Sequence, residues 1–246
     1  MRKIHLLDIE FEYGGQRQTI VPALLEDERG SILIDCGYPE FLPMLEAAAA
    51  RKGIPFSSIA TVVLTHHDMD HIGSLAALQR AYPHIEVVAH EREKPYLEGT
   101  AKSLRLEQAE AMLGAMPDSA RPQAEQFIRL LQSIEPARVD RTVADGERLP
   151  WFGGMEIVPT PGHMPGHISI YLPAEKTLIA GDAVVVEDGR LNLANPQFAL
   201  DMEEAVRSVR KLLDYDIERL ICYHGGELRG GIKEALLDVL ERYEVG

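Results

Sequence analysis

Five residues of metal-binding type lie within six positions of the chain, in the run Thr65-His66-His67-Asp68-Met69-Asp70-His71. The run directly follows residues 59–65, a continuous apolar, β-branched segment that is typical of a strand covered on both faces. Alternate side chains of an extended segment share one side, so His66, Asp68 and Asp70 are expected to face together. His71 opens the next predicted helix and can turn back toward the same space. Imidazole and carboxylate groups at this density indicate a metal site rather than a packing role.

Three more polar groups follow predicted strands farther along the chain. The first is a Gly/Pro-rich loop that contains Gly162-His163 and His167. The second is the pair Gly181-Asp182, and the third is His224. Each group alone is typical of a loop histidine or a capping aspartate. What distinguishes them is that these three groups and the run at residues 65–71 all follow strands and occur in one order.

This order of motifs resembles the metallo-β-lactamase superfamily of binuclear metallohydrolases, and the resemblance covers nearly the whole chain. The family pattern is His-x-His-x-Asp-His, then Gly-His, Gly-Asp and a last His after a strand. It is matched here from His66 and at residues 162–163, 181–182 and 224. The early segment Asp35-Cys36-Gly37 also looks like the family's Asp-x-Gly turn, which supports the metal loop without binding metal.

The resemblance implies a ligand set for two divalent metal ions. One site would use His66, Asp68 and His163, and the other would use Asp70, His71 and His224, with Asp182 bridging both ions. Asp70 would also be the catalytic carboxylate beside the nucleophile. His67 would point away from the metals, and His167 would support the ligands or stabilise the fold. Zinc is the expected metal, with manganese or iron as alternatives.

Asp68 departs from the family pattern, which has histidine at this position. Three interpretations stay open: Asp68 replaces the imidazole and keeps two metals, it weakens the first site so that one ion binds tightly, or His67 substitutes for it. Counting two divalent ions, three carboxylates and a bridging hydroxide gives a neutral centre, which predicts a less acidic bridging water than with histidine. On this basis, Asp68→His should restore the common motif and keep both ions.

The remaining segments predict an α+β fold, an αββα sandwich of two mixed β-sheets packed face to face with helices on both outer faces. Strand-rich blocks followed by helices occur in both halves of the chain. Strands are expected at residues 4–11, 20–25, 31–35, 59–65, 85–89, 155–160, 167–172, 177–180 and 218–223, and helices at 41–51, 72–81, 202–213 and 232–242. Residues 1–246 are expected to form a single domain.

A helical insertion is expected at about residues 96–133, with amphipathic helices near 100–115 and 119–133. Such an insertion would cover a cleft, pack against a second copy of the chain in a homodimer, or do both. Residues 184–198, which follow Asp182, are expected to line the substrate cleft.

Composition narrows the class of partner. The chain has 246 residues, is 46% hydrophobic and carries a formal net charge of −14, so nucleic-acid substrates are disfavoured. The sequence contains no apolar run long enough for a membrane span and begins with no secretory signal. Its two cysteines, Cys36 and Cys222, are predicted to be buried and reduced, which favours a cytoplasmic location.

By resemblance, the expected function is hydrolysis of an ester, thioester, lactone or amide bond of a small molecule by a metal-bridging hydroxide. A lactonase-like or small-ester hydrolase fits the size and acidity, whereas glyoxalase II-type thioesterases carry an extra C-terminal helical domain. The alternatives are a phosphodiesterase-type hydrolase, a flavodiiron-like redox protein, and a non-catalytic member of the fold.

Overall fold

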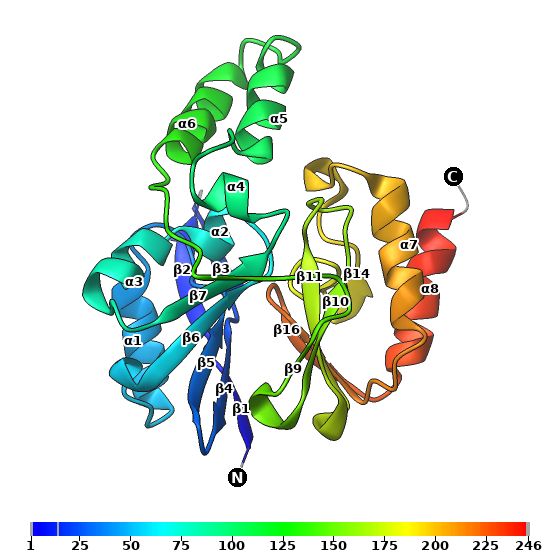
Figure 1. Cartoon of the computed structure of the whole chain (residues 1–246). Coiled ribbons are helices and arrows are strands. Elements are labelled where there is room, and N and C mark those ends of the chain that lie inside the picture. Colours follow the sequence, from blue (N-terminus) through cyan, green and yellow to red (C-terminus); the bar gives the residue numbers. More distant parts are fainter. Residues whose placement is uncertain (1, 14, 245–246) are drawn as a thin grey trace.

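Two six-stranded mixed sheets form the centre of the computed structural model, which describes residues 2–13 and 15–244 (Figure 1). The first sheet has the strand order β1-β4-β5-β6-β7-β8. Its strands are Lys3–Leu6, Ala23–Asp27, Gly30–Ile34, Ile59–Leu64, Glu86–His90 and Arg141–Val143. The first three strands pair antiparallel, and β5, β6, β7 and β8 pair parallel. The four parallel strands therefore end at the same edge.

The second sheet has the order β16-β15-β12-β11-β10-β9. Its strands are Gly226–Arg229, Arg219–Cys222, Thr177–Ile179, Ile168–Leu172, Met155–Pro159 and Arg148–Leu149. The pair β12–β15 is parallel and the other pairs are antiparallel. Two further hairpins pair β2 (Ile9–Tyr13) with β3 (Gln16–Ile20) and β13 (Val185–Glu187) with β14 (Arg190–Asn192).

Helices cover the outer face of each sheet, and a hydrophobic core fills the space between the sheets (Figure 1). Val63 of β6 packs in this central core with residues of the second sheet such as Ile170. Its neighbour Val62 faces the opposite core beneath α1 (Leu42–Arg51) and α3 (Leu75–Ala81). The helices α7 (Met202–Leu212) and α8 (Ile232–Glu244) cover the second sheet. The predicted αββα sandwich is confirmed.

Three helices lie between β7 and β8. They are α4 (Lys94–Leu97), α5 (Leu104–Leu113) and α6 (Arg121–Gln132). The helices α5 and α6 stand beyond the sandwich at the end where the parallel strands of the first sheet terminate (Figure 1). Within the described residues, no helix combines the length and the apolar character needed to cross a bilayer.

Candidate metal centre

The ligands predicted from the sequence lie at the strand ends of both sheets. His66 and Asp68 follow β6, and the short helix α2 (Met69–Ile72) then presents Asp70 and His71. The second sheet contributes His163 from the β10–β11 loop, Asp182 after β12 and His224 after β15. A hydrogen bond from Ile168 N to Thr65 O (3.0 Å) joins the two sheets beside the site. The sandwich therefore brings ligands together that are far apart in the sequence.

His66, Asp68 and His163 form the first cluster. The Oδ2 atom of Asp68 lies 3.5 Å from His66 Nε2 and 2.8 Å from His163 Nε2. All three residues are buried, and their ligand atoms lie within 4.8 Å of one another. The structure thus groups Asp68, rather than His67, with the two histidines.

Asp70, His71, Asp182 and His224 form the second cluster, again with ligand atoms within 4.8 Å of one another. Asp70 Oδ2 lies 3.1 Å from His224 Nε2 and 3.7 Å from His71 Nε2. The side chains of His224 and Asp70 are 33% and 17% exposed, so this cluster faces the solvent more than the first one does.

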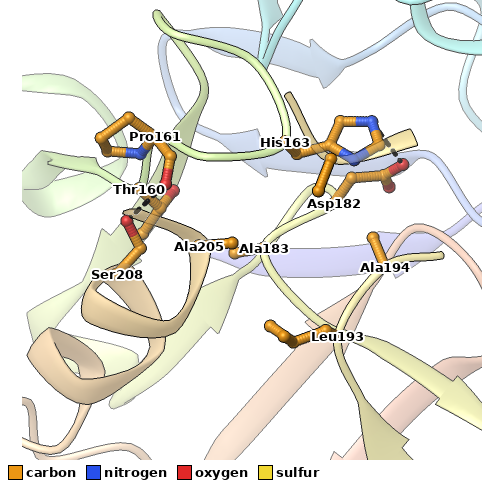
Figure 2. A pocket seen from close by; sticks show the side chains of 10 residues that line it. Thr160, Pro161, His163, Asp182, Ala183, Leu193, Ala194, Ala205 and Ser208 are labelled. Carbon is orange, nitrogen blue, oxygen red and sulfur yellow. Dashed lines mark hydrogen bonds and ion pairs between the residues drawn. The ribbon is translucent and has the colours of Figure 1, made fainter. Parts of the chain in front are cut away.

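Asp182 lies between the clusters and presents one carboxylate oxygen to each. Its Oδ1 is 3.4 Å from His71 Nε2 and 3.7 Å from His224 Nε2, whereas its Oδ2 is 3.6 Å from His163 Nε2 (Figure 2). This is the arrangement required of a carboxylate that bridges two ions.

The chemistry of the buried donor atoms fits metal ions. His66 Nε2, His71 Nε2 and Asp182 Oδ1 are buried without a hydrogen-bond partner among the described residues. Buried polar atoms are normally paired, and imidazole nitrogens with carboxylate oxygens are the donors that zinc and related ions bind. Two such clusters are consistent with a binuclear metal centre.

The histidines and carboxylates of the second cluster shift one another's pKa values. Burial by itself lowers the pKa of His71, but the charges of Asp182, Asp70 and Asp35 raise it well above its ordinary value. Burial raises the pKa of Asp182, yet the charges of His71 and His224 hold it well below its ordinary value. Both shifts result from attraction between the imidazole and carboxylate groups that the cluster brings together.

Asp35 and His167 are each hydrogen-bonded to a residue of the second cluster. Asp35 Oδ2 lies 2.8 Å from His71 Nδ1, which fixes that ring and leaves Nε2 facing the cluster. The same carboxylate accepts hydrogen bonds from Thr65 N and Oγ1, each at 2.8 Å. His167 Nε2 accepts a hydrogen bond of 2.9 Å from Asp182 N, and burial lowers the pKa of His167 to about 3, so the ring is neutral.

Arg105 of α5 enters the first cluster, and sequence reasoning missed it. Its Nε donates to Asp68 Oδ1 (3.0 Å), its Nη2 donates to Asp68 Oδ2 (2.7 Å), and Nη2 also lies 3.3 Å from His163 Nε2. Burial alone would raise the pKa of Asp68, but the Arg105 charge, the hydrogen bonds from His163 and Arg105, and the nearby His66 ring hold it well below its ordinary value. The charge count made from the sequence omitted this cation and needs correction.

His67 points away from both clusters, as the resemblance implied. Its ring stacks on Tyr96 with centroids 4.4 Å apart, and its Nδ1 is hydrogen-bonded to Glu93. The buried Glu93 also accepts a hydrogen bond from Gly166 N (2.9 Å), so it links the metal loop to the loop that carries His163. Nothing in the sequence distinguished Glu93 from the other acidic residues of the chain.

A narrow hollow of about 10 Å³, the size of a single water molecule, lies beside the first cluster (Figure 2). His163 and Asp182 form its polar side, and Ala183, Leu193 and Ala194 are among its small and apolar lining residues. Leu193 and Ala194 belong to residues 184–198, the segment expected to line the cleft. Phe198, at the end of this segment, packs against the Arg105 guanidinium at 5.0 Å.

Comparison with known proteins shows the family. The sequence profile of the Metallo-beta-lactamase superfamily matches residues 20–224. The chain belongs to the metallo-beta-lactamase superfamily. This superfamily member is 30% identical over 214 residues to the uncharacterized protein YobT of Bacillus subtilis, with 84% of this chain and 83% of YobT covered. It is 27% identical to the probable metallo-hydrolase YflN of the same organism, with 81% and 76% covered.

Solved structures of the superfamily share the fold. A metallo-beta-lactamase family protein from Thermus thermophilus matches with a TM-score of 0.77 at 21% identity, over 98% of this chain and 79% of that one.

A further relative in sequence matches only part of its own length. A hydroxyacylglutathione hydrolase of Rhizobium meliloti is 25% identical over 162 residues, which cover 65% of this chain and 46% of the hydrolase. The superfamily member thus aligns with less than half of that enzyme.

Proposed function

We propose that the protein is a binuclear metal-dependent hydrolase that cleaves an ester, thioester or lactone bond of a small molecule. The observation that carries the proposal is the position of Asp182, whose two oxygens face two separate ligand clusters. The similarity to a probable metallo-hydrolase, and at lower coverage to a hydroxyacylglutathione hydrolase, supports hydrolysis. Two divalent ions, with zinc as the expected metal, would lower the pKa of a water molecule and polarise the oxygen of the scissile bond.

The residues of the site have distinct tasks in this reaction. One ion would be held by His66, Asp68 and His163. The other ion would be held by Asp70, His71 and His224, and Asp182 would bind both ions. The Asp70 carboxylate, beside His224 at the more exposed cluster, would also orient the attacking water and accept its proton. Asp35 and His167 keep His71 and Asp182 in position while the substrate binds.

Two observations favour an acyl substrate over a phosphodiester. Arg105 forms a bidentate ion pair with Asp68, so its charge is already neutralised and its guanidinium is not free to bind the phosphate of a substrate. The chain as a whole carries a formal charge of −14, which repels polyanions.

A substrate panel tests the proposal. The metal-loaded protein is assayed with chromogenic esters, thioesters, lactones and a phosphodiester, before and after chelation and after metal is restored. We expect turnover of at least one acyl substrate that chelation abolishes and metal restores. Asp118→Asn, an exposed carboxylate whose side chain is 93% accessible, is the matched control and should behave as wild type. Turnover of the phosphodiester alone, or of no substrate, would contradict the acyl-hydrolase proposal.

A further inference from the structure

The docking of α5 depends on a charged side chain. Among the ten residues of α5, all of which the structure describes, Arg105 is the one that is buried, with 3% of its surface exposed. Helices normally dock through an apolar stripe. Here, Met112 of the same helix is 47% exposed, while the guanidinium passes between Phe198 and the first ligand cluster. The one buried side chain of α5 is therefore in contact with the first ligand cluster.

The contact between Arg105 and Asp68 is an oriented one. Nε and Nη2 bind the two oxygens of the carboxylate at 3.0 and 2.7 Å, a geometry that the planar guanidinium allows and a lysine does not. Both side chains are nearly inaccessible, at 4% and 9%. The pair fixes the plane of the carboxylate and leaves Oδ2 close to His66 and His163.

The pair also changes the charge of the centre. The positive charge of Arg105 cancels the negative charge of Asp68, so the formal charge of the remaining carboxylates is that of Asp70 and Asp182 alone. A neutral histidine at position 68, without Arg105, would leave the same charge. The pair is thus electrostatically equivalent to the residue that the common motif places there.

We propose that Asp68 and Arg105 act as one unit that replaces the motif's second histidine, with Arg105 as the positioning residue that orients Asp68 and cancels its charge. This inference rests on the binuclear centre proposed above. It reverses the expectation that Asp68→His alone restores the common motif, because that substitution leaves the Arg105 charge buried and unpaired beside a cation site.

A double-mutant cycle tests the unit with wild type, Asp68→His, Arg105→Met and the double variant. Two properties are measured: the affinity for the more weakly held ion, by competition with a chromogenic chelator, and the Tm of the metal-free protein. We expect Asp68→His to weaken that affinity about 10- to 100-fold, the range known for groups that orient metal ligands. Each single variant should lower the Tm, because each leaves one buried charge without its partner.

The double variant shows whether the effects of the two substitutions are coupled. We expect it to bind the ion within a few-fold of wild type and to have a higher metal-free Tm than either single variant, because neither charge is left unpaired. Arg129→Met, an exposed arginine on α6, is the matched control and should change neither property. The proposal of a single unit would be contradicted if the losses of metal affinity and Tm in the double variant were additive. It would also be contradicted if Asp68→His alone bound the ion as tightly as wild type.

The outcomes also separate this inference from the proposed function. A wild-type chain that binds no second ion would refute the binuclear centre. If the wild-type chain binds two ions and the effects of the two substitutions on metal affinity and Tm are additive, the Asp68–Arg105 unit is refuted but the binuclear centre is not. If Arg105 only anchored α5, Arg105→Met would lower the Tm further in the Asp68→His background and would restore no metal affinity.

Discussion

Asp182 owes its orientation to a backbone contact. Its amide N donates to the neutral His167, and the preceding Gly181 has a φ of +55°, a conformation that glycine adopts at low cost. A Cβ atom on Gly181 would lie 2.7 Å from His167 Nε2, so a larger residue there would displace the histidine. The bridging position of the carboxylate is therefore built into the turn after β12.

Asp182→Asn should lower hydrolysis by several orders of magnitude and leave the fold intact. Asparagine is similar in shape, but it lacks the negative charge and the second anionic oxygen that two ions require. The check is kcat with the substrate found by the panel, together with circular dichroism of the variant. Near-native activity in Asp182→Asn would remove the binuclear assignment.

The dense run at residues 66–71 indicates a metal site by itself, whereas His163, Asp182 and His224 could be predicted as ligands only through the family resemblance. Arg105 could not, because it pairs with Asp68 across 37 positions and lies in a segment where arginine is an ordinary helix former. Tyr223, whose hydroxyl donates to Asp70 O (2.6 Å), was hidden in the same way within a strand-like run. Partners defined only by tertiary contact leave no local pattern.

At the scale of elements, the β10–β11 loop places His163. Gly162 has a φ of +128°, and its carbonyl accepts hydrogen bonds of 2.9 Å from both Leu200 N and Asp201 N at the start of α7. A Cβ atom at Gly162 would lie 2.2 Å from Ala205 N, which is backbone of α7 and cannot easily move. The loop and the helix thus fit together only with glycine at this position.

Gly162→Ala should destabilise the protein more than Gly154→Ala does. Both positions have positive φ, at +128° and +116°, but a Cβ at Gly154 meets no described atom within 4 Å. The two variants therefore share the backbone strain, and the clash should cost Gly162→Ala about 1–3 kcal/mol more. Urea denaturation measures the difference, and metal affinity should fall only in Gly162→Ala. Equal stability of the two variants would show that the loop is not constrained by α7.

Long elements could be predicted from the sequence better than short ones. Residues 4–11 were expected to form one strand, but the structure divides them into β1 and β2, which pair with different strands. The hairpin of β13 and β14 was missed, although its turn at Asp188-Gly189 has positive φ at both residues and is a recognised hairpin signal. Strands of three residues carry too little periodicity to be distinguished from loop.

At the scale of the molecule, the sandwich follows from the pattern of the central strands. Residues of β6 alternate between two hydrophobic cores, which requires cover on both faces and hence a layer on each side. Ligands from the two sheets meet because the strand ends of both sheets reach the same edge. The sequence motifs could indicate this meeting only through resemblance to a family, since no local rule aligns one sheet with another.

The most direct test of the account is the number of metal ions bound per chain. After expression with added zinc, manganese or iron and removal of loosely bound ions, elemental analysis should find close to two ions, one for each cluster. Asp118→Asn should bind as many ions as wild type, and Asp182→Asn should bind fewer. One ion per chain at saturation would contradict the binuclear centre, and no bound ion would contradict the metal centre altogether.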